Sequence, residues 1–141
     1  MTINEIQDEI IDEFSFFGDW MEKYEYIIDL GKGLSLIDEQ YKTDDYLIRG
    51  CQSRVWLRAD AAPGGKVVFT ADSDAVITKG IIALLMRVLS DQTATEVANA
   101  DLYFIDKIGL KEHLSPTRSN GLLSMVKQMK LYGLALSTQA S

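Results

Sequence analysis

The sequence predicts an α+β domain in which a small antiparallel β-sheet packs against helices. Apolar residues recur at helical spacing in the first 31 residues and again after residue 75. Between these segments, two stretches that alternate apolar and polar residues flank a turn at residues 61–66. The length of 141 residues suits one domain with its own core, so we expect residues 1–141 to fold as a single unit.

The first predicted helix is amphipathic and acidic. Its apolar side chains recur at helical spacing, at Ile3, Ile6, Ile10 and Phe14. Thr2 or Asn4 can serve as its N-cap. The acidic residues between the apolar ones form either a solvated face, which we favour, or a docking surface for a basic partner.

A second helix is predicted over residues 19–33. Asp19 is a suitable N-cap, and Glu22 follows three positions later, as in a capping box. Gly31 and Gly33 are expected to end this helix. Residues 34–48 show no regular pattern and are polar in their middle, so we expect an irregular segment there.

A β-hairpin is predicted from residues 53–60 and 66–74. In the first strand, Val55 and Leu57 face one side of the sheet, while Trp56 and Arg58 face the other. The loop between the strands contains one Pro and two Gly residues, which favour a turn.

The second strand is expected to lead directly into the next helix. Asp72, Ser73 and Asp74 end the strand and open that helix. The spacing of the two carboxylates would also suit metal ligands, but we favour a strand end followed by a helix N-cap.

The helix predicted over residues 75–89 is apolar almost all round, which is typical of a central buried helix. A capping box at Thr93 and Glu96 then opens a short helix that stops near residue 99. Residues 101–109 form a short element that ends at Gly109.

The last predicted helix begins after residue 115. Ser115 is its expected N-cap, and Pro116 occupies the first helical position, where its missing N–H costs nothing. Its apolar stripe consists of Leu122, Val126, Met129 and Leu136.

Composition and charge exclude several classes of partner and compartment. A net charge of −7 and a sequence pI near 4.6 argue against nucleic acid, which is bound by clustered Lys and Arg. No apolar run is long enough to span a membrane, and the acidic start does not resemble a signal peptide. One cysteine can form no internal disulfide, which indicates a reducing compartment, and we expect the cytoplasm.

The inventory of reactive side chains is small. One Cys and one His cannot fill a structural zinc site, so we expect no metal. The sequence also contains no phosphate-binding loop. Cys51 and His113 could form a nucleophilic pair only if the fold brings them together. For His113 we favour a structural role over a catalytic one.

Cys51 has an unusual setting for a lone cysteine. It follows Gly50, has Arg49 and Arg54 nearby, and lies among polar neighbours. The glycine permits a sharp turn, and the two positive charges would favour a thiolate. A small buried hydrophobic residue is the equally weighted alternative.

Four segments of the chain resemble the SufE family of iron–sulfur cluster assembly. They are "FGDWMEKYEYIIDLGKGL" at 17–34, "RGCQSRVWL" at 49–57, "DSDAVITKGIIALL" at 72–85 and "GLKEHLSPTRSNGLLSM" at 109–125. The likeness covers roughly residues 10–130, in the family's order and with compatible spacing. One departure is the absence of a Leu-Pro pair after the early helix, which leaves the path of residues 34–45 open.

The resemblance implies a fold and a function. The fold would be the α+β core that SufE proteins share with IscU-type scaffolds. A PLP-dependent cysteine desulfurase of the SufS kind would hold sulfur as a persulfide, and Cys51 would accept it, stimulating desulfurase turnover. The sulfur would then pass to an iron–sulfur scaffold. The chain would be a carrier without a cofactor of its own rather than a stand-alone enzyme.

The resemblance also implies which residues act. Cys51 would carry the sulfur, supported by a loop of Arg49, Gly50, Gln52, Ser53 and Arg54. From the residues themselves, Asp74, His113 and Arg118 are further candidates for contacting the partner or orienting this loop. We favour a structural role for Asp74, and for Arg118 an exposed residue in the first helical turn is the equally weighted alternative. We expect the thiol to be partly shielded by Val55, Leu57, Ile77, Ile81 and Leu84. Burial would raise the pKa of the thiol and the arginines would lower it, and the sequence does not decide between them.

Two alternatives remain from the sequence. The chain could be an adaptor that stimulates a desulfurase without carrying sulfur, or a small thiol-dependent peroxidase. Whether it forms a homodimer is also open.

Overall fold

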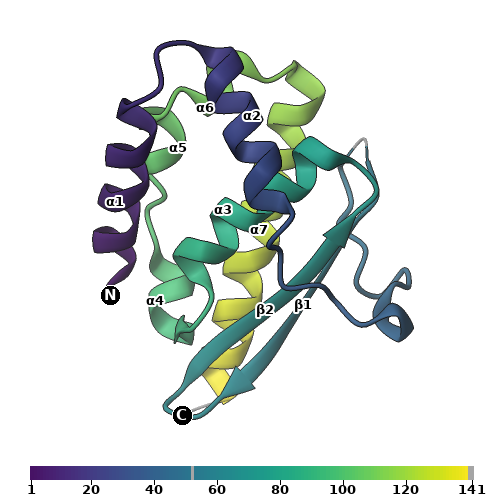
Figure 1. Cartoon of the computed structure of the whole chain (residues 1–141). Helices are drawn as coiled ribbons and strands as arrows, with labels where there is room; N and C mark the ends of the chain where they lie inside the picture. Colours follow the sequence, from purple (N-terminus) through teal and green to yellow (C-terminus); the bar gives the residue numbers. More distant parts are fainter. Residues whose placement is uncertain (52, 140–141) are drawn as a thin grey trace.

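The computed structural model describes residues 1–51 and 53–139. A long β-hairpin runs along one side of the molecule, and most of the helices gather against one of its faces (Figure 1). The elements are α1 Ile3–Ser15, α2 Trp20–Gly31, the 3₁₀ helix η1 Glu39–Tyr41, β1 Val55–Ala62, β2 Lys66–Ser73, α3 Val76–Leu89, β3 Gln92–Thr93, α4 Ala94–Asn99, α5 Phe104–Lys107, α6 Leu110–His113 and α7 Pro116–Gln139. The three described strands form an antiparallel sheet in the order β1-β2-β3, which confirms the predicted α+β class.

The N-terminal helices begin at the predicted caps. Thr2 Oγ1 accepts the Glu5 N–H at 3.1 Å, and Glu5 Oε1 accepts the Thr2 N–H at 2.9 Å, which makes a full capping box. Asp19 Oδ1 likewise accepts the Glu22 N–H at 2.9 Å. The sequence did not indicate that Gln7 is fully buried, where it donates to Asp101 O at 3.0 Å.

Helix α2 ends at Gly31, but without the left-handed glycine C-cap that was expected. Neither Gly31 nor Gly33 has a positive φ, so neither provides a left-handed C-cap. Gly31 instead lies where α2 crosses α3: a Cβ on it would come 2.8 Å from Gly80 N. A Cβ on Gly80 would come 2.0 Å from Ile27 O. The two glycines therefore let the helix backbones approach closely.

The hairpin has the predicted alternation. Its register runs from Val55 opposite Ser73 to Ala62 opposite Lys66, and the turn holds Gly64 and Gly65 at φ 80° and 73°. The inward side chains are fully buried, namely Val55, Leu57, Val67, Phe69 and Ala71. Trp56 and Arg58 lie on the other face and are half-exposed.

Residues 34–48, which include the departure from the SufE pattern, lie along both edges of the hairpin. Ala71 donates to Ser35 O at 3.1 Å and accepts from Ile37 N at 3.0 Å, so the chain first lies along β2. After η1 it returns along β1, where Leu57 donates to Tyr46 O at 2.9 Å and Ile48 donates to Val55 O at 2.8 Å. This path delivers the chain to Gly50 and Cys51 at the start of β1.

Helix α3 is the central helix, as predicted, and most of its residues are buried. The strand end expected at residues 72–74 is confirmed, but neither carboxylate there caps α3. Ala75 is the N-cap and has no side-chain capping bond, while Ser73 Oγ accepts the Ala75 N–H at 3.2 Å. Asp74 Oδ1 instead accepts the Arg54 N–H at 3.1 Å, which ties the start of β1 to the end of β2.

The C-terminal elements keep their predicted caps. Thr93 Oγ1 accepts the Glu96 N–H at 3.3 Å at the start of α4. Gly109, at φ 76°, separates α5 from α6, a helix that the sequence did not reveal. Ser115 Oγ accepts the Arg118 N–H at 3.3 Å, and Pro116 is the first residue of α7. Within residues 1–51 and 53–139, no helix combines the length and the apolarity needed to cross a membrane.

Candidate functional site

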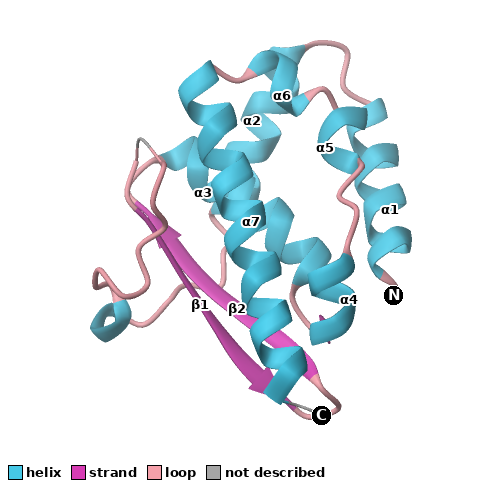
Figure 2. Ribbon diagram, turned by 180° about the vertical axis from the view of Figure 1, so that it is seen from behind, coloured by secondary structure: helices cyan, strands magenta, loops and turns pink. Residues whose placement is uncertain are grey.

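Cys51 lies on the loop that enters β1, at the end of the hairpin away from its turn. The bond from Ile48 N to Val55 O closes this loop, and Gly50 within it has φ 90°, which L side chains rarely adopt. Figure 2 shows that β1 begins beside α3. The thiol is half-buried there, so the loop folds back toward the helices.

A small cavity of about 20 Å³ adjoins the thiol. Its described lining comes from the loop itself, from α3 and from the first turns of α7: Cys51, Ser53, Thr78, Ile81, Thr117, Arg118, Gly121 and Met125. A space of this size holds about one water-sized atom. The site is therefore a narrow pocket for a single small group, not a substrate cleft.

The Cys51 loop contacts α7 at two points. The Cys51 Sγ–H donates to Gly121 O, with the sulfur 3.7 Å from the oxygen. A Cβ on Gly121 would lie 3.6 Å from Sγ, so the helix backbone is in contact with the thiol. A Cβ on Gly50 would come 2.7 Å from Ser124 Oγ, one turn further along α7. A side chain at Gly50 would force Ser124 Oγ to move, and the positive φ would strain the docked loop.

Burial raises the pKa of the Cys51 thiol. The thiol therefore keeps its proton near neutral pH while the loop is docked, in line with its donation to Gly121 O. Arg49 and Arg54 are exposed, and burial is the cause of the shift. Support of a thiolate by these arginines stays a prediction.

The structure brings together some of the predicted residues and separates others. Ser53 and Arg118 line the cavity with Cys51. Gln52 lies outside the described residues. The Trp20 ring stacks on His113 with centroids 4.4 Å apart, and His113 Nδ1 lies 2.9 Å from Gly109 O. His113 is not among the described residues that line the cavity, so the structure gives no support to a Cys–His pair.

The walls of the cavity were only partly predicted. Ile81 was expected to shield the thiol and does so, whereas Val55, Leu57, Ile77 and Leu84 belong to the core and do not line the described cavity. The wall formed by α7 was missed. Thr117, Gly121 and Met125 follow each other at intervals of four, which places them on one helix face. That spacing was visible in the sequence, but nothing in it pointed this face at Cys51.

The two carboxylates that could have been metal ligands have other partners. Asp72 Oδ2 lies 2.6 Å from Lys42 Nζ, and Oδ1 lies 3.2 Å from Lys79 Nζ. Burial alone would raise the pKa of Asp72, but hydrogen bonds from Lys42, from the Ser73 N–H and from Lys79 outweigh it and lower the pKa. In the described part of the chain, no three His, Cys, Asp or Glu side chains gather closely enough to hold a metal ion.

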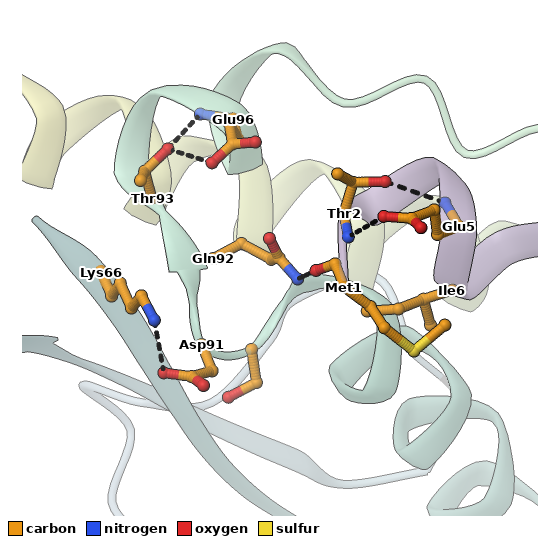
Figure 3. A pocket seen from close by; sticks show the side chains of 10 residues that line it. Met1, Thr2, Glu5, Ile6, Lys66, Asp91, Gln92, Thr93 and Glu96 are labelled. Atoms are coloured by element: carbon orange, nitrogen blue, oxygen red, sulfur yellow. Dashed lines mark hydrogen bonds and ion pairs between the residues drawn. The ribbon is translucent and has the colours of Figure 1, made fainter. Parts of the chain in front are cut away.

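A wider hollow lies between the start of α1 and the segment that forms β3 and the start of α4 (Figure 3). Its polar side chains serve the fold: Thr2 and Glu5 cap α1, and Thr93 and Glu96 cap α4. Lys66 Nζ lies 4.0 Å from Asp91 Oδ1, and Gln92 Nε2 donates to Met1 O at 3.1 Å. This hollow offers no reactive group comparable to Cys51.

A solved structure has the same overall fold. The solution structure of a hypothetical protein from Thermus thermophilus superposes with a TM-score of 0.77, covering 94% of this chain and 96% of that one. The two sequences are 18% identical, so this likeness concerns the fold alone.

Sequence relatives identify the family. An uncharacterized SufE-like protein of Rhizobium etli is 42% identical over 127 residues, covering 87% of this chain and 86% of its own. Another, from Rhizobium meliloti, is 39% identical over 127 residues, with 87% and 91% coverage. A sequence model of SufE, described as an Fe-S metabolism associated domain, matches residues 8–132. The chain therefore belongs to the SufE family and to iron–sulfur metabolism.

Proposed function

We propose that this protein accepts sulfane sulfur from the persulfide of a PLP-dependent cysteine desulfurase and carries it on Cys51. The observation that supports this most directly is the setting of the thiol. It lies on a glycine-containing loop and rests half-buried beside a cavity with room for about one atom. A peptide or metabolite substrate would need a larger space.

The transfer is a thiol–disulfide type of exchange. The Cys51 proton leaves to solvent, and the thiolate attacks the outer sulfur of the partner's persulfide. A new S–S bond forms at Cys51 while the partner's S–S bond breaks, and the partner's cysteine leaves as a thiolate. No external oxidant or reductant is needed. The desulfurase and its PLP perform the cleavage of free cysteine, so this chain binds no cofactor.

The docked loop is the resting state of the site, and not the state in which Cys51 attacks the persulfide. Burial raises the pKa of the thiol, and the Sγ–H is held against Gly121 O, so both nucleophilicity and access are low. Attack requires the loop to leave α7. A desulfurase that binds the undocked loop better than the docked one shifts the population toward it.

The same pocket would shelter the product. Ile81 and Met125 are buried and apolar, and they line the cavity beside the sulfur. A persulfide placed there is shielded from thiols in solution, which would otherwise remove the outer sulfur. The loop would open again at an iron–sulfur scaffold. We place this exchange in the cytoplasm, because a lone cysteine suits a reducing compartment.

One experiment separates the relay from its alternatives. The protein is mixed with a cysteine desulfurase, PLP and cysteine, and intact mass is followed by mass spectrometry, with Cys51→Ser as the matched control. The relay predicts one added sulfur on the wild type and none on the control, together with loss of desulfurase stimulation by the control. Full stimulation by Cys51→Ser would leave only the adaptor function. A thiol peroxidase would instead consume peroxide without any protein partner.

A further inference from the structure

Gly121 is a glycine without a packing reason in the resting protein. It is buried in α7, its φ is not positive, and a Cβ built on it would lie 3.6 Å from Cys51 Sγ. That distance is an ordinary van der Waals contact. At Gly80 and Gly133, by contrast, a Cβ would come within 2.0 Å and 2.9 Å of backbone atoms. Alanine would fit at residue 121 and would favour the helix, because glycine is a poor helix former.

We propose that Gly121 is the specificity-determining residue for the cargo of Cys51: its missing Cβ leaves the space that the outer sulfur of the persulfide occupies when the loop is docked. The inference rests on the proposed function and adds the residue that sets the size of the cargo. It also explains why a helix-weakening glycine faces the thiol.

The dimensions support this assignment. An outer sulfur bonds to Sγ at about 2.05 Å and needs one atom-sized space next to it. The cavity of about 20 Å³ supplies such a space, which is somewhat more than a single water requires. Its other walls already carry side chains, from Thr78 and Ile81 on α3 and from Met125 on α7. A methyl carbon at residue 121 would occupy the remaining side, in contact with Sγ.

The space therefore admits one added sulfur and excludes larger groups. With one sulfur added, the loop can dock on α7 as it does in the resting protein. With two sulfurs, or with an alanine at residue 121, the loaded loop cannot dock, and the outer sulfur faces solvent. Glutathione thiolate can then attack that sulfur and form glutathione persulfide. In the one-sulfur form the Cys51 S–S bond breaks and Cys51 leaves as a thiolate. In the two-sulfur form the bond between the two added sulfurs breaks, and Cys51 is left as a one-sulfur persulfide.

The test compares the lifetime of the persulfide in wild type, Gly121→Ala and Gly33→Ala. Gly33→Ala is a matched control, because its Cβ would lie 3.7 Å from Leu30 O, an ordinary contact in a different part of the fold. Each protein is loaded in two ways, by a cysteine desulfurase with cysteine and, separately, by inorganic polysulfide. After removal of the donor, glutathione is added, and the forms with one and two added sulfurs are followed by intact mass.

We expect the one-sulfur form of Gly121→Ala to decay about tenfold faster than that of the wild type and of Gly33→Ala. The two-sulfur form should decay equally fast in wild type and Gly121→Ala. Unloaded Gly121→Ala should melt at or above the wild-type temperature and react no faster with iodoacetamide. Loading should lower the melting temperature of Gly121→Ala more than that of the wild type.

Equal lifetimes of the one-sulfur form in all three proteins would overturn the inference. So would faster iodoacetamide labelling of unloaded Gly121→Ala, because the substitution would then merely disturb the resting loop. Loading by polysulfide separates this inference from the proposed function. A wild type that takes no sulfur from the desulfurase, but shows the lifetime difference after polysulfide loading, would refute the relay and support the role of Gly121.

Discussion

Replacing Gly50 by alanine should release the Cys51 loop from α7. Gly50 has φ 90°, and a Cβ there would come 2.7 Å from Ser124 Oγ. The positive φ alone costs an L-residue about 1–2 kcal/mol. Because the loop can leave the helix while the core stays folded, most of this cost falls on the docked state. A difference of about 1–2 kcal/mol changes the docking equilibrium by a factor of about 5–30.

The assay is the rate of Cys51 alkylation by iodoacetamide in the free protein. We expect Gly50→Ala to label about 5–30 times faster than the wild type, up to the rate of an unshielded thiol. Gly64→Ala is the matched control. Gly64 has a similar φ of 80° in the hairpin turn, and a Cβ there would meet no atom within 4 Å, so the same backbone strain arises away from the thiol. Equal labelling of Gly50→Ala and Gly64→Ala would refute the idea that docking on α7 shields Cys51.

Three further predictions concern capping, charge and gating. Ser115→Ala removes the N-cap of α7 and should lower the free energy of unfolding by about 0.5–2 kcal/mol, with near-normal sulfur uptake well below the melting temperature. The lowered pKa of Asp72 contributes stability that is present above the unfolded-state pKa and lost as pH falls through the folded-state pKa, so Asp72→Asn should flatten the acid side of a stability–pH curve. Alkylation of wild-type Cys51 should be slow in the free protein and faster in complex with a desulfurase that lacks its own catalytic cysteine.

Each of these has an outcome that would count against it. A large loss of sulfur uptake by Ser115→Ala at unchanged stability would give Ser115 a direct role. An acid limb unaltered by Asp72→Asn would mean that the Lys42 and Lys79 contacts contribute little. Fast labelling of the free protein, or a complex that only blocks the reagent, would contradict gating. Arg118→Ala belongs to the same labelling series, because Arg118 lines the thiol cavity and its role in positioning the loop stays a prediction.

The features that sequence alone determined are those set by neighbours along the chain. The N-caps at Thr2, Asp19, Thr93 and Ser115 are bonds across three residues, so the local pattern specifies them. The alternation in β1 and the apolar run of α3 follow from burial on one face or on all faces. The resemblance of four segments to one family was also readable, and it singled out Cys51.

The tertiary structure alone decided what surrounds the thiol and how helices approach each other. Gly121 is 70 residues from Cys51 along the chain, and no periodicity shows that this face of α7 covers the loop. Gly31 meets Gly80 across a helix crossing, so a glycine expected only to end a helix also permits close packing. His113 stacks on Trp20, and Asp74 accepts the Arg54 N–H. Both partners are distant along the chain, so no local pattern predicts these contacts. Local propensity acts over a few residues, whereas the cavity exists only after distant elements have packed.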